Sequence, residues 1–415
     1  MRTAMQWVLD RGLSTPGLRV AGGLGKFWLR GGHQREGRRW LATMLALPPA
    51  ADDVAAMDAR ATALEGAAGL AEDAHDFAQA TALFAQSESL RRALGQDERL
   101  TAGRINAAME ARARGDYARA TTLLEESLAQ YRGLGAGESA GQGGLGPMIS
   151  FAYRYTLLAL VLTEQGAYAR ATALCEECLR LTRELGDMEG SGVALLSLAD
   201  AARDQGDAGR TRAYAEQSLA LFRELGHPWA IGFSLNDLAQ AAYLDGDLAR
   251  AARQAEESAT VFRDMQAGPS LAEALITLGR VRGARGAAAA AHADLTEALT
   301  LAGVAGPRLV VVAALDELGV QAVRQGQAQQ GAHLLGATAR LRQAMGTPVR
   351  PGDQFALENA LAAARASLGD APFAEAWAVG QALPEEQLVA RAVAGRDDDV
   401  VATEQPDGDV LHRPV

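Results

Sequence analysis

The chain has 415 residues, of which 48% are hydrophobic and 5% aromatic, and 40 basic against 51 acidic residues give it a net charge of −11. An acidic balance argues against direct nucleic-acid binding, which needs a basic face to displace counterions from phosphates. No apolar run reaches the roughly 18 residues of a membrane span, and the N-terminal MRTAMQWVLDRG contains no signal-peptide core. We therefore expect a cytoplasmic protein that contacts neither nucleic acid nor membrane.

Residues 1–56 are expected to form an N-terminal helical cap made of three short helices. Apolar residues recur there at helical spacing, and Pro48 and Pro49 follow, which cannot continue a helix. The apolar positions are Met5, Val8 and Leu9 in the first helix, Leu24, Phe27 and Trp28 in the second, and Trp40, Leu41, Met44 and Leu45 in the third.

A repeat fills residues 57–346. A glycine turn followed five residues later by a small side chain recurs in steps of 51, 40, 40, 40 and 40 residues. One helix pair of this size cannot bury its own apolar face and must stack on a neighbour. The pattern predicts an all-α, right-handed helical solenoid of about seven helix pairs. The turn glycines are Gly115, Gly166, Gly206, Gly246, Gly286 and Gly326.

The single long step reflects a Gly-rich insertion at about 136–147, which we expect to be a flexible loop between two repeats. The second helix of each pair ends at a recurrent Leu-Gly, where glycine supplies a left-handed cap. These dipeptides are Leu94-Gly95, Leu134-Gly135, Leu185-Gly186 and Leu225-Gly226.

Residues 347–394 leave the repeat and are expected to form a C-terminal helical cap that covers the last apolar face. One helix is predicted from about Gly352 to Leu368, and a second begins near Pro372 and carries Phe373 and Trp377. Residues 395–415 are rich in acids and have no apolar period, which predicts a disordered acidic tail.

The repeat resembles the tetratricopeptide family, in which a small residue seven before the turn glycine packs against the small residue five after it. The period of 40 instead of 34 implies longer helix pairs. The corresponding small residues are Ala68, Ala108, Ala159, Ala199, Ala239, Gly279 and Gly319.

A second resemblance covers residues 1–393. AMQWVLDRG and FWLRGGHQREGRRWL near the start, and LLGATARLRQAMGTPVRP and LGDAPFAEAWAVGQAL near the end, are similar to the C-terminal helical arm of bacterial signalling ATPases of the STAND class, including LuxR-type transcription regulators. In those proteins the arm resembles a sensor and partner-binding surface. The flanking ATPase and DNA-binding parts are absent from this sequence.

The sequence contains only weak matches to motifs for nucleotide binding, metal binding or catalysis. AGGLGKF at Ala21–Phe27 lacks the spacing and the Ser/Thr of a phosphate loop. Cys175 and Cys178 fall on core positions inside a helix, where cysteine acts as a small apolar residue, so we expect neither a metal nor a redox site. The recurrent acid pairs Glu125-Glu126, Glu176-Glu177 and Glu256-Glu257 are typical of a solvated face. We predict that the chain is not an enzyme and holds no cofactor.

The concave groove remains as the candidate site. The tetratricopeptide resemblance implies that the first helices line it, through residues three before, one after and four after the close-packing small residue. Tyr153 and Phe233, six before that residue, are expected to point the same way. The groove positions are Leu196, Asp200, Arg203, Asn236, Gln240, Tyr243, Ile276 and Arg280.

These observations favour a non-enzymatic interaction and sensing module that holds a peptide or a partner protein in its groove. The alternative is an effector-sensing arm of an ATP-dependent, LuxR-type transcription regulator, which would bind a small molecule. A third interpretation is an accessory scaffold for an enzyme. The oligomeric state is left open by the sequence.

Overall fold

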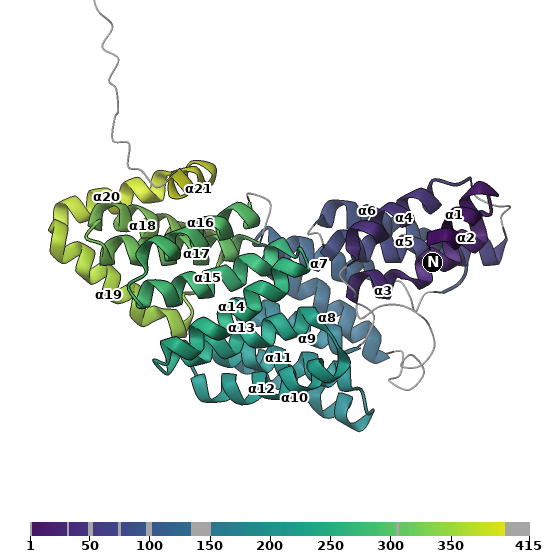
Figure 1. Ribbon diagram of the computed structural model, residues 1–415, viewed down its shortest axis with the longest axis horizontal. Coiled ribbons are helices and arrows are strands. Elements are labelled where there is room, and N and C mark those ends of the chain that lie inside the picture. Colours follow the sequence, from purple (N-terminus) through teal and green to yellow (C-terminus); the bar gives the residue numbers. More distant parts are fainter. Residues whose placement is uncertain are drawn as a thin grey trace, which may run out of the picture.

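The computed structural model describes residues 2–30, 33–48, 53–73, 76–96, 102–133, 151–303 and 307–394, and within these ranges every regular element is a helix. The helices stack side by side in antiparallel pairs, with the N-terminal helices at one end of the molecule and α19 to α21 at the other (Figure 1). The insertion predicted at 136–147 and the tail predicted at 395–415 lie outside the described residues.

The N-terminal segment forms four helices where three were expected, because Ser14–Gly23 is helical despite Pro16 and three glycines. Two of the glycines permit close packing. A Cβ on Gly17 would lie 2.7 Å from the sulfur of Met44, and one on Gly22 would lie 3.1 Å from the backbone nitrogen of Ala63. The four helices are α1 (Arg2–Asp10), α2 (Ser14–Gly23), α3 (Gly25–Arg30) and α4 (Gln34–Leu45).

Seven helix pairs follow in the described part of the chain, which agrees with the predicted solenoid. The first helices of the pairs are α5 (Val54–Asp73), α7 (Ala102–Ala113), α9 (Phe151–Glu164), α11 (Met188–Asp204), α13 (Pro228–Leu244), α15 (Gly268–Ala284) and α17 (Arg308–Arg324). The second helices are α6 (Phe77–Ala93), α8 (Tyr117–Gly133), α10 (Tyr168–Glu184), α12 (Ala208–Leu225), α14 (Leu248–Asp264), α16 (Ala288–Ala302) and α18 (Ala328–Met345).

The turn glycines have the backbone conformation that the repeat requires. From Gly115 to Gly326 all six have φ between 77° and 81°, where a side chain is strained. The Leu-Gly ends at Gly95, Gly186 and Gly226 are likewise left-handed, which confirms those predicted caps, whereas Leu134-Gly135 lies outside the described residues. In the fifth pair Gln266 takes the same conformation, with φ of 56°.

The two cysteines are core residues, as predicted. Ser218 in α12 donates a hydrogen bond to the carbonyl oxygen of Gly192 in the preceding helix, at 3.1 Å. Cys178 occupies the equivalent place in α10, with its sulfur 3.9 Å from the carbonyl oxygen of Ala152. Cys175 and Cys178 are fully buried, and burial raises the pKa of the Cys178 thiol to about 12. Packing in the core is sufficient to explain why these two positions hold cysteine.

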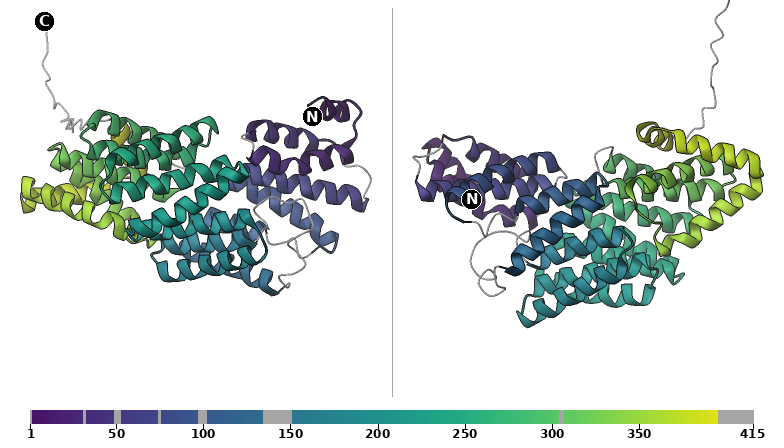
Figure 2. Two further views of the ribbon diagram at one scale, coloured as in Figure 1. Left: turned by 60° about the horizontal axis from the view of Figure 1, so that its bottom comes forward. Right: turned by 180° about the vertical axis from the view of Figure 1, so that it is seen from behind.

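The C-terminal helices are α19 (Pro351–Leu368), α20 (Asp370–Ala382) and α21 (Glu385–Ala394), the last of which was not foreseen. Helix α20 lies close against α18, since a Cβ on Gly336 would be 2.6 Å from the carbonyl oxygen of Trp377. Helix α19 covers α17 and α18 and also reaches α11 (Figure 2). The chain after α18 therefore returns to repeats that lie far earlier in the sequence.

Candidate functional site

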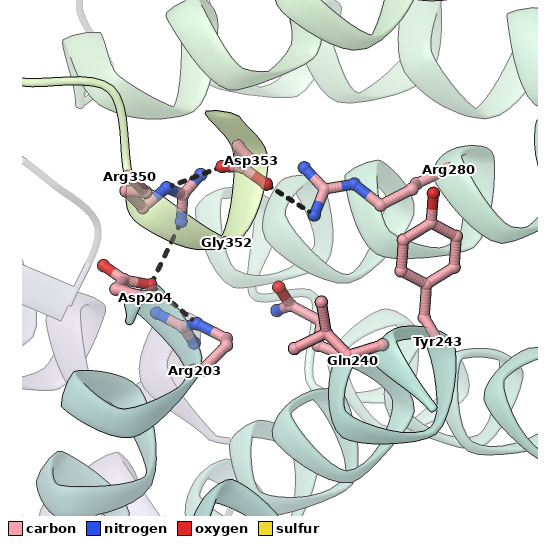
Figure 3. A pocket seen from close by; sticks show the side chains of 9 residues that line it. Arg203, Asp204, Gln240, Tyr243, Arg280, Arg350, Gly352 and Asp353 are labelled. Carbon is pink, nitrogen blue, oxygen red and sulfur yellow. Dashed lines mark hydrogen bonds and ion pairs between the residues drawn. The ribbon is translucent and has the colours of Figure 1, made fainter. Parts of the chain in front are cut away.

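A cleft on the inner side of the solenoid brings together the first helices α11, α13 and α15 and the start of α19 (Figure 3). It encloses about 10 Å³ of free volume, which is room for about one water molecule. Its walls are mostly charged or polar. We call this the cleft, and its lining residues are Arg203, Asp204, Gln240, Tyr243, Leu244, Arg280, Arg350, Gly352 and Asp353.

Arg203 is the centre of one ion-pair cluster in the cleft. Its guanidinium lies 2.6 Å from an oxygen of Asp200, 2.9 Å from Asp204 and 2.7 Å from Asp237. Burial raises the pKa of Asp237 well above its ordinary value, and the neighbouring Asp200 adds to the increase, while Arg203 opposes it. One guanidinium thus pairs with carboxylates from two successive repeats. Its positive charge offsets the cost of burying those carboxylates together.

Arg280 is the centre of a second cluster. It pairs with Glu317 at 2.7 Å and with Asp353 at 2.9 Å, and its guanidinium lies 5.8 Å from the ring centre of Tyr243. Burial raises the pKa of Asp353, but Arg280 and Arg350 outweigh it and lower the pKa to about 2. Asp353 therefore carries its negative charge at neutral pH.

Several buried oxygen atoms near the cleft have no hydrogen-bond donor among the described residues. They are the side-chain oxygens Oδ1 of Asn236, Oδ2 of Asp237 and Oε1 of Gln321, on residues at most 4% exposed. Buried acceptors without a donor carry a desolvation cost. These three atoms lie beneath the inner surface, out of contact with the cleft.

Glu273 of α15 faces the same interior. Burial raises its pKa to about 7, Arg112 and Arg203 lower it, and Asp200 and Glu164 raise it further. Arg112 itself is held by Glu164, with Nε 2.8 Å from a carboxylate oxygen. Charged side chains of α7, α9 and α11 therefore influence the pKa of Glu273 on α15.

Four of the ten predicted groove residues line the cleft together: Arg203, Gln240, Tyr243 and Arg280. Asp200 joins them through its ion pair with Arg203, and Asn236 lies buried near them on α13.

The other four predicted residues do not line the cleft. Leu196 and Ile276 are buried apolar residues, 5% and 7% exposed, and Tyr153 is half-buried against the main core. Phe233 packs between two aromatic rings, with its centroid 4.5 Å from that of Trp229 and 4.9 Å from that of Phe262. Their role in binding stays a prediction.

Sequence reasoning missed Asp204, Leu244, Arg350, Gly352 and Asp353. The first two lie five after the close-packing small residue, one position beyond the set that the tetratricopeptide resemblance implied. The last three come from outside the repeat, so no periodic signal marks them.

A second opening, which we call the hollow, lies between the second helices α8 and α10 and measures about 360 Å³. Leu128, Leu158 and Leu174 supply its apolar walls. Two ion pairs border it, Arg170 with Glu125 at 2.7 Å and Arg132 with Glu177 at 2.9 Å. In the next repeat Tyr214 stands where Leu174 stands here, so the hollow reflects the smaller side chain.

The recurrent acids of the second helices make contacts between repeats. Besides the two pairs at the hollow, Glu257 lies 3.4 Å from Arg223, and Glu297 lies 3.5 Å from Arg263 of the preceding second helix. All four of these side chains are about half exposed. Each exposed ion pair of this kind contributes little to stability. The solvated face therefore also carries weak electrostatic links between successive repeats.

Over the described ranges, no group of three or more His, Cys, Asp or Glu side chains is arranged to hold a metal ion. The same residues include no helix with the length and apolarity that crossing a bilayer requires.

No family model matches the chain, and no curated protein matches it significantly in sequence. Solved structures match it in fold. A Rap protein complexed with competence and sporulation factor has a TM-score of 0.56 at 11% identity, over 91% of this chain and 99% of that chain.

Two further structures are more distant. Aspartyl phosphate phosphatase F from Bacillus subtilis has a TM-score of 0.47 at 9% identity, over 89% of this chain and 94% of that one. A STAND protein with a tetratricopeptide repeat sensor from Pyrococcus horikoshii has a TM-score of 0.44 at 12% identity, over 86% of this chain and 54% of that one. The likeness to the Rap protein shows the fold alone, and it confirms the predicted tetratricopeptide-type helical solenoid.

Proposed function

We propose that the chain is a non-enzymatic protein-interaction module whose cleft binds a peptide or a segment of a partner protein. One observation carries this proposal. The cleft already holds three residues from outside the repeat array, Arg350, Gly352 and Asp353. Side chains from three successive first helices contact or face them. A surface that holds the start of α19 through ion pairs has the charged groups to hold another segment of chain.

Two features support this function. The cleft offers guanidinium and carboxylate groups from two ion-pair clusters, which suit the charged side chains of a peptide. In addition, the Rap structure of similar fold is complexed with competence and sporulation factor. Ion pairs account for the charged groups of the cleft, and binding by this surface requires no cofactor.

The test is to select binders for the full chain from a random-peptide display library and to measure them on two variants. Gln240→Ala removes a cleft amide, whereas Gln217→Ala removes an exposed amide on α12, on the outer layer of helices. We expect selected peptides to bind Gln240→Ala at least tenfold more weakly and Gln217→Ala as they bind the original chain. Binders that are insensitive to Gln240→Ala would place the interaction elsewhere.

The hollow favours the second candidate function, the sensing of a small effector. Its volume of about 360 Å³ lies within the range of small-molecule sites, and it combines apolar walls with two arginines at the border. An effector that binds there raises the melting temperature of the chain in proportion to the logarithm of its concentration. Leu174→Tyr, which copies the residue of the next repeat, should abolish that increase.

A further inference from the structure

The residues that enter the cleft belong to one short stretch, Gly346–Asp353, which we call the crossing segment. It joins α18 to the first turn of α19 and runs along the turn glycines of three earlier repeats. A Cβ on these glycines would meet the segment and its flanking Met345 at distances of 2.8, 2.8 and 3.3 Å. The contacting pairs are Gly115 with Met345, Gly166 with Pro348, and Gly206 with Gly352.

Ion pairs fix the position of the crossing segment along the cleft. Arg350 lies 3.4 Å from Asp204 and 3.0 Å from Asp353, and Asp353 lies 2.9 Å from Arg280 (Figure 3). A basic residue therefore faces an acidic wall of the cleft, and an acidic residue three positions later faces a basic wall.

Apolar burial anchors only the start of this contact, where Met345, 7% exposed, belongs to the main hydrophobic core. Val349 is 37% exposed and Phe355, just beyond the segment, is 76% exposed. The segment is held by ion pairs and by the approach of backbone to backbone at Gly206. An attachment of this kind can be exchanged for an equivalent one without opening the hydrophobic core.

We propose that the crossing segment is an intramolecular ligand of the cleft, and that the partner is a segment with the same charge pattern at the start of a helix, an arginine followed three residues later by an aspartate or glutamate. This inference rests on the proposed function, because it assumes that the cleft takes a partner. The partner displaces the crossing segment, and the start of α19 leaves α11. Binding at the cleft is thereby coupled to the position of the C-terminal helices.

The experiment uses the full chain and a fluorescent nine-residue peptide with the sequence of residues 347–355, TPVRPGDQF, followed by anisotropy. Asp353→Asn weakens the intramolecular ion pairs. Gly352→Ala weakens the attachment of the crossing segment sterically, because the new Cβ would lie 3.0 Å from the carbonyl oxygen of Arg203. Glu358→Gln is the matched control, since it replaces an exposed acid on the same helix.

We expect the peptide to bind Asp353→Asn and Gly352→Ala at least tenfold more tightly than the original chain or Glu358→Gln. A peptide in which the arginine and the aspartate are exchanged for each other should not bind. Equal binding of the two peptides, or equal binding by all four proteins with native circular dichroism, would overturn the inference.

The outcome is separable from that of the proposed function. Some library peptides could require Gln240 for binding, yet lack the charge pattern and fail to compete with TPVRPGDQF. That result would support the proposed function and contradict this inference. Binding of TPVRPGDQF to Asp353→Asn, with no library peptide dependent on Gln240, would keep the intramolecular ligand and remove the function.

Discussion

Arg350 forms an ion pair with Asp204, with Nη1 and Oδ1 3.4 Å apart, although 146 positions separate the two residues in the sequence. The contact joins the chain after the last repeat to the end of α11. It closes the inner side of the solenoid and makes the cleft depend on the C-terminal helices. Stability, pH dependence and partner binding are consequently linked at this site.

The first prediction compares two turn glycines. Gly206→Ala and Gly246→Ala both place a side chain at positive φ, 77° and 80°, which costs about 1 kcal/mol. Only at Gly206 does the new Cβ meet another part of the chain, Gly352 at 3.3 Å, whereas Gly246 faces open space. Urea unfolding should show Gly206→Ala to be the more destabilising by roughly another 1 kcal/mol. Equal costs would mean that the crossing segment does not press on this turn.

The repeat array was predictable from the sequence because its determinants are local and periodic. Turn glycines such as Gly166 and Gly246 recur every 40 residues where φ is positive, and small residues such as Gly279 recur where a Cβ would be 2.8 Å from Leu295. The tetratricopeptide resemblance, applied to these repeats, implied groove positions that include Arg203, Gln240 and Arg280, and these three line the cleft.

The rest of the site depends on contacts that no local pattern encodes. Arg350 and Asp353 reach the cleft only because the solenoid curves until α19 meets α11, and that curvature is a sum over many helix contacts. Helix α2 was missed for a different reason. Two of its glycines, which have low helix propensity, lie where α2 packs against Met44 and Ala63.

A second prediction concerns Glu273, whose pKa is raised from 4.5 to about 7, chiefly by burial. The folded state then binds this proton more tightly than the unfolded state, so the contribution to stability is complete below pH 4.5 and is lost as the pH rises through 7. Glu273→Gln should remove that loss and stabilise the chain at pH 8 by about 3 kcal/mol. Denaturant unfolding across pH 4 to 8 measures it.

The control for this series is Glu257→Gln, an exposed acid paired with Arg223 on the outer helices. It should change stability by less than about 1 kcal/mol at every pH. A pH profile of Glu273→Gln that runs parallel to that of the original chain would refute the assignment of a raised pKa.

A third prediction addresses the buried cluster at Arg203. Arg203→Met leaves Asp200, Asp204 and Asp237 without their shared cation and should cost about 3–5 kcal/mol at pH 7. The cost should shrink at pH 5, because protonation relieves the repulsion among the carboxylates. Arg223→Met, at an arginine that is 57% exposed, should cost less than about 1 kcal/mol. Similar costs for the two arginines would show that the cluster is not a structural centre.

A fourth prediction concerns Gln266, the one non-glycine residue with positive φ among those described. Its φ of 56° is close to the 62° of Gly226 in the preceding repeat. Gln266→Gly should therefore stabilise the chain by about 1 kcal/mol. Gln217→Gly, inside a helix, should destabilise it by a similar amount, and chemical denaturation of both variants gives the comparison.

The central claim is that the inner surface of the first helices binds a peptide segment, and hydrogen exchange on Asp353→Asn with saturating TPVRPGDQF tests it most directly. We predict slower exchange of the amides at the ends of α11 and α13, around Asp204 and Tyr243, and faster exchange in the first turn of α19. Protection confined to the outer helices α10 and α12, or exchange unchanged by bound peptide, would contradict the claim.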